Sequence, residues 1–227
     1  MAHSLAIVSA WVKHCKQPYV ALSGGKDSTA CLGLAHMVTD DVTPVYFDDE
    51  WEYPETTAYL SAIPGLLRLA NTAYHAPEFT AWNYPTPPEH LTPGAIWTGK
   101  TPGPEWLRAQ GFDGAVIGLR MDENTRRRVH ILAGGDLFER KNGVLQCYPV
   151  ARWSTLDIWT FIAEHGIPYN AAYDIMDDGG VPLDHQRIGP IITERAHCGP
   201  ELTYTFWPQL WKRFCERHPA ATVFGWR

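Results

Sequence analysis

The sequence contains no apolar run that approaches the roughly 20 residues needed for a membrane-spanning helix. Residues 1–16 are interrupted by His3, Trp11 and Lys13 and have no basic stretch before the apolar part, so they predict an opening helix and not a signal peptide. Basic charge is also scarce, because 19 Lys and Arg against 25 Asp and Glu give a formal net charge of −6. This balance disfavours broad binding to nucleic-acid backbones and leaves only a local basic patch open. We therefore expect a cytoplasmic protein without a membrane partner.

Cysteine is scarce and scattered. The sequence has neither a Cys-x-x-Cys pair nor the ligand spacing of a zinc site or an iron–sulfur cluster. An odd, dispersed set suits a reducing compartment, where each thiol serves as a small apolar side chain in or near the core. We therefore expect no zinc and no iron–sulfur cluster. The five cysteines are Cys15, Cys31, Cys147, Cys198 and Cys215.

The composition is that of a compact globular protein, with 45% hydrophobic and 19% charged residues in 227 positions. Strand-like and helix-like segments alternate, which predicts a doubly wound α/β fold with a mostly parallel sheet of about five strands and helices on both faces. Ligands of such sheets bind at the carboxyl ends of the strands. The expected strands cover 18–23, 43–47, 71–75, 114–119 and 144–150, and the expected helices include 27–38 and 54–63.

A further helix is predicted after residue 154. Ser154 and Asp157 have the spacing of a capping box, and Gly166 ends the helix. Its expected apolar stripe consists of Ile158, Trp159 and Ile162.

Two stretches fall outside the alternation. Residues 77–104 are rich in proline and predict a long ordered loop or cover. The chain is predicted to be irregular from Asp174 until a closing amphipathic helix over 207–218, with one apolar side. We therefore expect an α/β domain over residues 1–174 and a C-terminal extension over 175–227 that packs on it. The apolar side of the closing helix would consist of Leu210, Trp211, Phe214 and Cys215.

The segment ALSGGKDS, residues 21–28, predicts a phosphate-binding loop. Gly24 and Gly25 permit a tight turn between a strand and a helix, and the amides at a helix start attract anions. The hydroxyls of Ser23 and Ser28 can add donors. Lys26 can add a positive charge, and we expect it to lie with Asp27 at an exposed helix start. A plain strand–turn–helix corner is the alternative, whereas the Walker A pattern is absent.

Four segments together resemble a known family. SGGKDS resembles the PP-loop of the adenine-nucleotide α-hydrolase superfamily, and FDDEWEYPET from Phe47 resembles the F-D-T-G-W-E-F-P-E-T segment of its phosphoadenosine-phosphosulfate (PAPS) reductase-like family. Gly118-Leu119-Arg120 with Glu123, Asn124 and Arg127 resembles G-L-R-x-x-Q-S-x-x-R. Residues 149–174 resemble two further motifs, P-L-x-x-W-x-x-x-D-V-W and I-P-Y-N-P-L-Y-D. The resemblance covers residues 18–174 and implies the fold and nucleotide site of that family.

The resemblance also implies roles for individual residues. It implies that Arg120 and Arg127 contact phosphate or sulfate oxygens, a task suited to the guanidinium fork. Arg126 and Arg128 can instead belong to a solvated helix face, and Trp51 and Trp153 can pack in the core instead of on adenine. The implied catalytic residues are Lys26, Asp27, Arg120, Arg127 and Cys198. The implied nucleotide-binding residues are Ser23, Gly24, Gly25, Lys26, Asp27, Ser28, Phe47, Asp48, Gly118 and Arg120.

The sequence departs from the family pattern at two places. Cys198-Gly199 keeps the Cys-Gly pair of the E-C-G-L-H motif of thiol-dependent reductases, but the Glu before this pair and the His after it are absent. Arg195 and His197 can still favour a Cys198 thiolate, whereas a buried, unreactive thiol is the alternative. Asp49 and Glu50 stand where the family has Thr and Gly, and carboxylates beside phosphates favour ATP with Mg²⁺ over PAPS.

Three functions follow from this sequence. The first is cleavage of ATP at its α-phosphate, with adenylyl transfer to an acceptor that the sequence does not specify. The second is reduction of a sulfonucleotide such as PAPS through Cys198, with thioredoxin as electron donor. The third is nucleotide binding without catalysis. In each case the expected partner is a small-molecule nucleotide, and a homodimer is left open.

Overall fold

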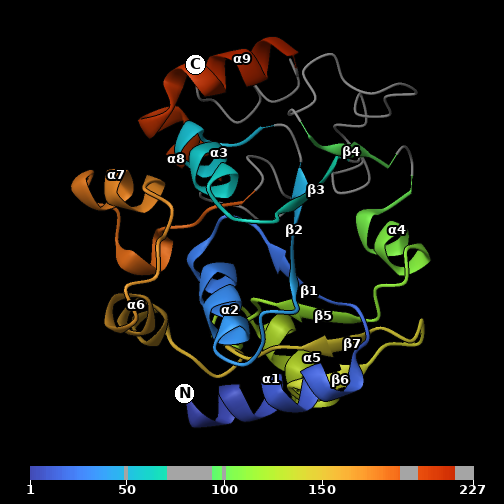
Figure 1. The fold of residues 1–227 in the computed structure, drawn as a ribbon. Helices are drawn as coiled ribbons and strands as arrows, with labels where there is room; N and C mark the ends of the chain where they lie inside the picture. Colours follow the sequence, from blue (N-terminus) through green and yellow to red (C-terminus); the bar gives the residue numbers. More distant parts are fainter. Residues whose placement is uncertain (49–50, 71–93, 99–100, 190–198, 218–227) are drawn as a thin grey trace. The chain divides into compact units, whose positions relative to one another are not determined.

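The computed structural model describes residues 1–48, 51–70, 94–98, 101–189 and 199–217 (Figure 1). The chain divides into two compact units. Unit 1 is drawn from Met1–Tyr46, Ile63–Leu67 and Pro104–Tyr169, and unit 2 from Phe47–Ala62, Arg68–Gly103 and Asn170–Arg227. The segment that follows the second strand therefore belongs to the same compact unit as the C-terminal part of the chain.

Unit 1 contains a mostly parallel sheet with the strand order β2-β1-β5-β7-β6. β1 lies at its centre and pairs in parallel with β2 and β5, so that Leu22 is opposite Tyr46 and Ala21 is opposite Ile117. β7 continues the parallel order beyond β5, and β6 is antiparallel to β7. The predicted α/β fold is confirmed. The strands are β1 (Pro18–Leu22), β2 (Thr43–Asp48), β5 (Gly114–Ile117), β6 (Leu137–Glu139) and β7 (Leu145–Cys147).

Helices cover both faces of this sheet. Gly114 of β5 lies against Cys15 and Trp11 at the end of α1, whereas Ile117 packs with Ile131 of α5. Because successive side chains of a strand point to opposite faces, α1 and α5 lie on opposite sides of β5. The helices are α1 (Ala2–His14), α2 (Lys26–His36), α4 (Gly103–Ala109), α5 (Thr125–Gly134) and α6 (Thr155–Glu164).

Helix α6 begins at the predicted capping box. The Ser154 hydroxyl accepts the backbone N–H of Asp157 at 3.1 Å, and the Asp157 carboxylate accepts the backbone N–H of Ser154 at 2.8 Å. The predicted stripe is wrong at Trp159, which is only half-buried, and Phe161 takes its place beside Ile158 and Ile162. At about 100° per residue, position 159 lies at the edge of the face that positions 158, 161 and 162 share.

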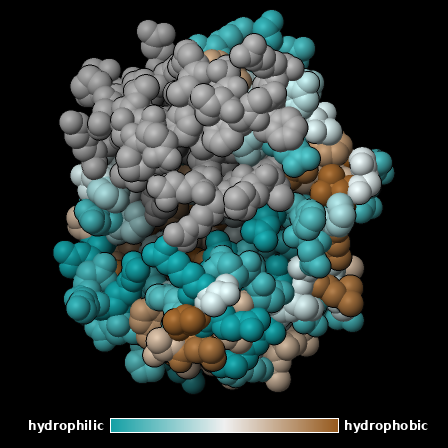
Figure 2. Space-filling model, turned by 180° about the vertical axis from the view of Figure 1, so that it is seen from behind, coloured by the Kyte–Doolittle hydropathy of each residue, from teal (hydrophilic) through white to brown (hydrophobic). Residues whose placement is uncertain are grey.

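Helix α5 contributes one buried residue, Ile131, to the core, and leaves Val129 and Leu132 exposed. Arg126 and Arg128 are exposed on the same helix, as expected for residues on a solvated helix face. In the space-filling view from behind, polar residues dominate the coloured surface and apolar residues form small patches (Figure 2).

Unit 2 has an aromatic core. The ring of Tyr53 stacks on Trp207 with 3.7 Å between centroids, and Trp51 meets Phe214 edge-to-face at 5.1 Å. The Trp207 indole N–H also donates to the carboxylate of Glu55 at 2.9 Å. The elements of this unit are β3 (Leu67–Ala70), which begins at its border, β4 (Ile96–Trp97), α3 (Pro54–Ser61), α7 (Ala172–Asp178), a 3-10 turn (Leu183–His185), α8 (Gly199–Phe206) and α9 (Pro208–Arg217).

Several sequence expectations about the second half of the chain change with the structure. The chain is not irregular after Asp174, because α7 continues to Asp178 and α8 precedes the predicted closing helix. These helices have seven and eight residues, too few to show a helical period in the sequence. The strand predicted over 71–75 lies outside the described residues, and β3 ends just before it. Within the described ranges, no helix combines the length and apolarity needed to cross a membrane.

Candidate functional site

The loop between β1 and α2 has the geometry of an anion-binding corner. Gly24 has a positive φ of 72°, and Gly25 forms the extended N-cap of α2. The Ser28 hydroxyl accepts the backbone N–H of Ser23 at 3.2 Å and donates to the Gly25 carbonyl at 2.9 Å, which fixes the turn. Gly25 offers no side-chain oxygen to the amides of the first helical turn. An anion can take that place, where the helix dipole is positive.

Lys26 is buried, with 5% of its surface exposed, so the predicted exposed position is wrong for this residue. Its ammonium group lies against the carboxylate of Asp27, with 3.2 Å between Nζ and Oδ2, and this contact keeps the charge out of solvent. The positive charge is therefore located at the first turn of α2 before any ligand binds.

Gly118 brings the carboxyl end of β5 against this turn. A Cβ atom built at Gly118 would lie 2.8 Å from both the carbonyl carbon of Asp27 and the backbone nitrogen of Ser28. Real Cβ atoms do not approach backbone atoms so closely, so only glycine fits here without moving the loop. The sequence predicted nucleotide binding for Gly118, and its observed contact is with the loop backbone.

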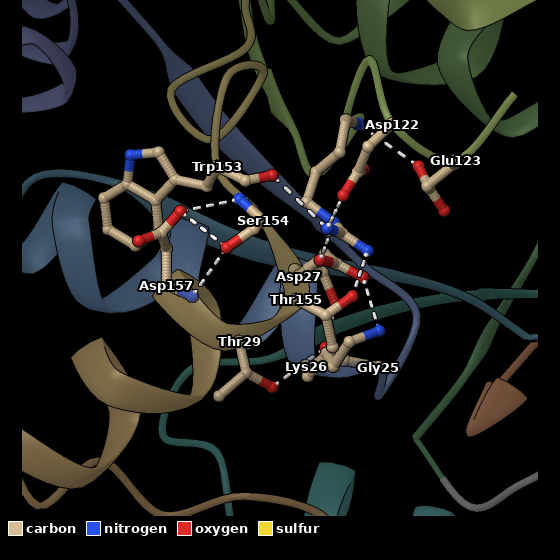
Figure 3. A network of polar contacts seen from close by, with 12 residues as sticks. Gly25, Lys26, Asp27, Thr29, Asp122, Glu123, Trp153, Ser154, Thr155 and Asp157 are labelled. Atoms are coloured by element: carbon tan, nitrogen blue, oxygen red, sulfur yellow. Dashed lines mark hydrogen bonds and ion pairs between the residues drawn. The ribbon is translucent and has the colours of Figure 1, made fainter. Parts of the chain in front are cut away.

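Arg120 follows two residues later and reaches the same carboxylate. Its Nε atom lies 2.7 Å from Oδ1 of Asp27, which is labelled in Figure 3, and the two groups form an ion pair without hydrogen-bond geometry. Its backbone N–H donates to Glu123 at 3.1 Å, and Glu123 also pairs with Arg127 on α5. The structure thus links Lys26, Asp27 and Arg120 directly, and Arg127 through Glu123. Two further members of this network that the sequence reasoning missed are Asp122 and Thr155.

Thr155 had one signal in the sequence, because it directly follows the N-cap residue Ser154. That position predicted the start of a helix, and it did not reveal that the Thr155 hydroxyl accepts an N–H from Arg120 at 3.1 Å. Asp122, which is 2.7 Å from Nη1 of Arg120, had no signal beyond its place near the G-L-R segment.

The remaining predicted residues are not part of the contact network described above. Phe47 and Asp48 belong to unit 2, where Asp48 is buried and lies 4.0 Å from Nη1 of Arg68. Trp51 packs on Phe214, and Trp153 packs on Phe161 and donates its indole N–H to Ser4 at 2.9 Å. Both tryptophans therefore make core contacts. The predictions for Asp49, Glu50, Arg195, His197 and Cys198 fall outside the described residues.

The four cysteines that the structure describes are free thiols. Burial raises the pKa of Cys31 and of Cys147 well above the ordinary value, and burial together with Asp113 raises the pKa of Cys15 to about 12. Burial also raises the pKa of Cys215. These thiols stay protonated at neutral pH and are poor nucleophiles. Among the described residues, no group of three or more His, Cys, Asp or Glu side chains is arranged to hold a metal ion.

Comparison with known proteins gives one family match. The model of the phosphoadenosine phosphosulfate reductase domain matches residues 17–192. A sulfate adenylyltransferase subunit 2 from Burkholderia lata is 27% identical and covers 76% of this chain, which matches 66% of that protein. A phosphoadenosine 5'-phosphosulfate reductase from Serratia proteamaculans is 21% identical over 72% of this chain and 68% of its own length.

Two further similarities concern length and fold. The uncharacterized protein YbdN of Escherichia coli is 24% identical over 87% of this chain, and the match spans 60% of that longer protein. A phosphoadenylyl-sulfate reductase from Candida auris, solved as a phosphate complex, superposes with a TM-score of 0.54 and 16% identity. That match covers 82% of this chain and 87% of the reductase, and it supports the fold.

Proposed function

The chain belongs to the phosphoadenosine phosphosulfate reductase domain family, and on that premise we propose that it binds ATP and cleaves it at the α-phosphate. In this reaction an oxygen of an acceptor substrate attacks the α-phosphorus. The bond between the α-phosphorus and the bridging oxygen breaks, and pyrophosphate leaves. The acceptor would retain the adenylyl group.

The observation that carries this proposal is the loop between β1 and α2. It combines a helix start capped by glycine, the exposed hydroxyl of Ser23 and a buried lysine, which together form a donor set for phosphate oxygens. Lys26 would neutralise charge that develops on the leaving pyrophosphate, and the amides of the first turn would stabilise the same oxygens. Arg127 would add a contact to a phosphate, and Phe47 and Asp48 would border the adenosine.

ATP is favoured as the nucleotide because Asp49 and Glu50 follow the second strand, and carboxylates beside bound phosphates call for a bridging cation. Mg²⁺ would arrive with the ATP phosphates, and Asp49 and Glu50 are the carboxylates that the sequence offers to it. A second candidate, reduction of a sulfonucleotide through Cys198 with thioredoxin, rests on the Cys198-Gly199 pair. A third, binding without catalysis, requires the loop alone.

One set of measurements separates the three candidates. The purified protein is heated with ATP, with ATP and Mg²⁺, with adenylylsulfate or with PAPS, and the shift in unfolding temperature reports which nucleotide binds. Pyrophosphate release from ATP supports the first candidate, and sulfite release from PAPS supports the second. A shift in unfolding temperature without either product supports the third.

Two variants connect the result to residues. Lys26→Met should abolish the ATP-induced shift, whereas Lys212→Met, at an exposed position on α9, should retain it. Cys198→Ser should leave nucleotide binding and pyrophosphate release intact. Loss of all turnover in Cys198→Ser, together with sulfite release from PAPS by the parent protein, would replace the first candidate by the second.

A further inference from the structure

Protein oxygen atoms lie within 3.3 Å of every nitrogen of the Arg120 guanidinium group. Arg120 is buried, with 4% exposure, and its Nε is 2.7 Å from Oδ1 of Asp27. Nη1 donates to Asp122 at 2.7 Å and to the Trp153 carbonyl at 3.3 Å, and Nη2 donates to the Thr155 hydroxyl at 3.1 Å (Figure 3). Hydrogen bonds therefore hold Nη1 and Nη2 against the protein, whereas Nε meets Asp27 as an ion pair without hydrogen-bond geometry.

Asp27 stands between two cations. One carboxylate oxygen faces Arg120, and the other accepts a hydrogen bond from Nζ of Lys26 at 3.2 Å. The Asp27 side chain is only 16% exposed, so the loss of either cation leaves a poorly solvated negative charge. The place of the Lys26 ammonium therefore depends on Asp27, and the place of Asp27 depends on Arg120.

The support behind Arg120 is rigid. Thr155 is the first residue of α6, and the capping box of that helix fixes the backbone directly before it. The Arg120 backbone is itself held by Glu123, and Gly118 packs against the backbone of Asp27. A side chain that is held by packed elements transmits its position to the group that it contacts.

We propose that Arg120 is a positioning residue, which holds Asp27 so that the ammonium group of Lys26 stands at the loop for an incoming phosphate. This assignment differs from the direct phosphate contact that the sequence predicted for Arg120. It rests on the proposed function only in naming phosphate as the ligand. Lys26 contacts the ligand, Asp27 orients Lys26, and Arg120 orients Asp27 without contacting the ligand.

A double-mutant cycle tests whether Arg120 acts on the ligand through Asp27. Arg120→Lys keeps the charge and loses the fork that reaches Asp27, Trp153 and Thr155 together. We expect it to weaken the binding of ATP and of inorganic pyrophosphate about tenfold, measured by titration calorimetry. In a chain that already carries Asp27→Asn, the same substitution should change both affinities by less than about threefold, because the carboxylate that Arg120 orients is gone. Equal losses in the two backgrounds would overturn the proposal in favour of direct contact.

A second measurement needs no ligand. Lys26 should react slowly with an amine-acylating reagent in the parent protein, and mass spectrometry should show at least about a threefold faster reaction in Arg120→Lys. Arg152→Lys is the matched control, because Arg152 binds Asp136 away from this network and is mostly exposed. An unchanged Lys26 rate in Arg120→Lys would overturn the proposal. If the parent protein binds neither ATP nor pyrophosphate, the proposed function fails while the labelling still decides the role of Arg120.

Folding of the variants is checked by thermal unfolding. Should Arg120→Lys not fold, Thr155→Val removes one partner of the fork at nearly constant volume and leaves Arg120 and Asp27 in place. We expect Thr155→Val to accelerate the labelling of Lys26 in the same direction and to a smaller extent. A labelling rate equal to that of the parent protein would count against the positioning role.

Discussion

At the scale of single residues, Gly118 is a position of the site that has no room for a side chain. Gly118→Ala would place a methyl group 2.8 Å from two backbone atoms of the loop, so either β5 or the first turn of α2 must move. We expect the free energy of unfolding to fall by about 1–3 kcal/mol and ATP binding to weaken. Urea unfolding and calorimetry measure the two effects.

The matched control for this change is Gly189→Ala. A Cβ atom built at Gly189 has no neighbour within 4 Å among the residues that the structure describes, and its backbone conformation suits other residues. It should therefore be neutral in both assays. Equal behaviour of the two alanine variants would show that the close approach at Gly118 does not constrain the loop.

The arginines of α5 offer a second comparison at this scale. Arg127 is linked through Glu123 to the Arg120 backbone, whereas Arg126 is exposed. We expect Arg127→Ala to weaken nucleotide binding by about 1.5–3 kcal/mol, as for the loss of a charged hydrogen bond, and Arg126→Ala to have little effect. Calorimetry with ATP measures both. The same loss in the two variants would mean that α5 acts as a general basic surface.

At the scale of elements, the start of α6 depends on its capping box. Hydrogen bonds from the backbone N–H and the hydroxyl of Ser154 lower the pKa of Asp157 below its ordinary value. A carboxylate with a depressed pKa in the folded state stabilises the protein above its unfolded pKa, about 4, and this stabilisation disappears as the pH falls through the lower folded value. The cap therefore contributes fully at neutral pH and weakly in acid.

The corresponding variant is Ser154→Ala. We expect it to lower the free energy of unfolding by about 1 kcal/mol at pH 7, because the amide of Asp157 loses its acceptor and the Asp157 carboxylate loses one of its two donors. The difference from the parent protein should shrink toward pH 3. Thr160→Ala, at an exposed position of the same helix, controls for helix propensity and should show no such pH dependence. If the free energy of unfolding of Ser154→Ala stayed below that of the parent protein by the same amount from pH 7 to pH 3, the ionised carboxylate would have no role in the cap.

At the scale of the whole molecule, the C-terminal helices belong to the same compact unit as the residues that follow β2. Trp207 stacks on Tyr53 and donates to Glu55, so residues more than 150 positions apart in the sequence share one core. Trp207→Ala should lower the free energy of unfolding by about 3–5 kcal/mol, measured by urea denaturation followed by circular dichroism.

Tyr204→Ala supplies the control, because Tyr204 lies on α8, three residues before Trp207, and is 37% exposed. Its effect should stay below about 1 kcal/mol. Similar midpoints for the two variants would show that the aromatic core of unit 2 contributes little to stability. A large effect of Trp207→Ala alone would show that the packing of Tyr53 and Glu55 depends on Trp207.

The sequence by itself determined the features that depend on neighbours along the chain. The strand, glycine pair and helix around residues 18–36, the capping box of α6 and the turn at Gly166 all follow from local backbone and side-chain chemistry. The family motifs added the identity of the domain, since their order spans most of the chain.

Only the tertiary structure decided what each charged residue contacts. Arg120 and Asp27 are far apart in sequence, and no local pattern indicates that the arginine faces a carboxylate and not a ligand. The burial of Lys26 and the packing of Tyr53 on Trp207 are likewise long-range contacts. Local signals select conformations of the backbone, whereas the partner of a buried charge or ring is set by which elements the fold brings together, because desolvation makes that partner necessary.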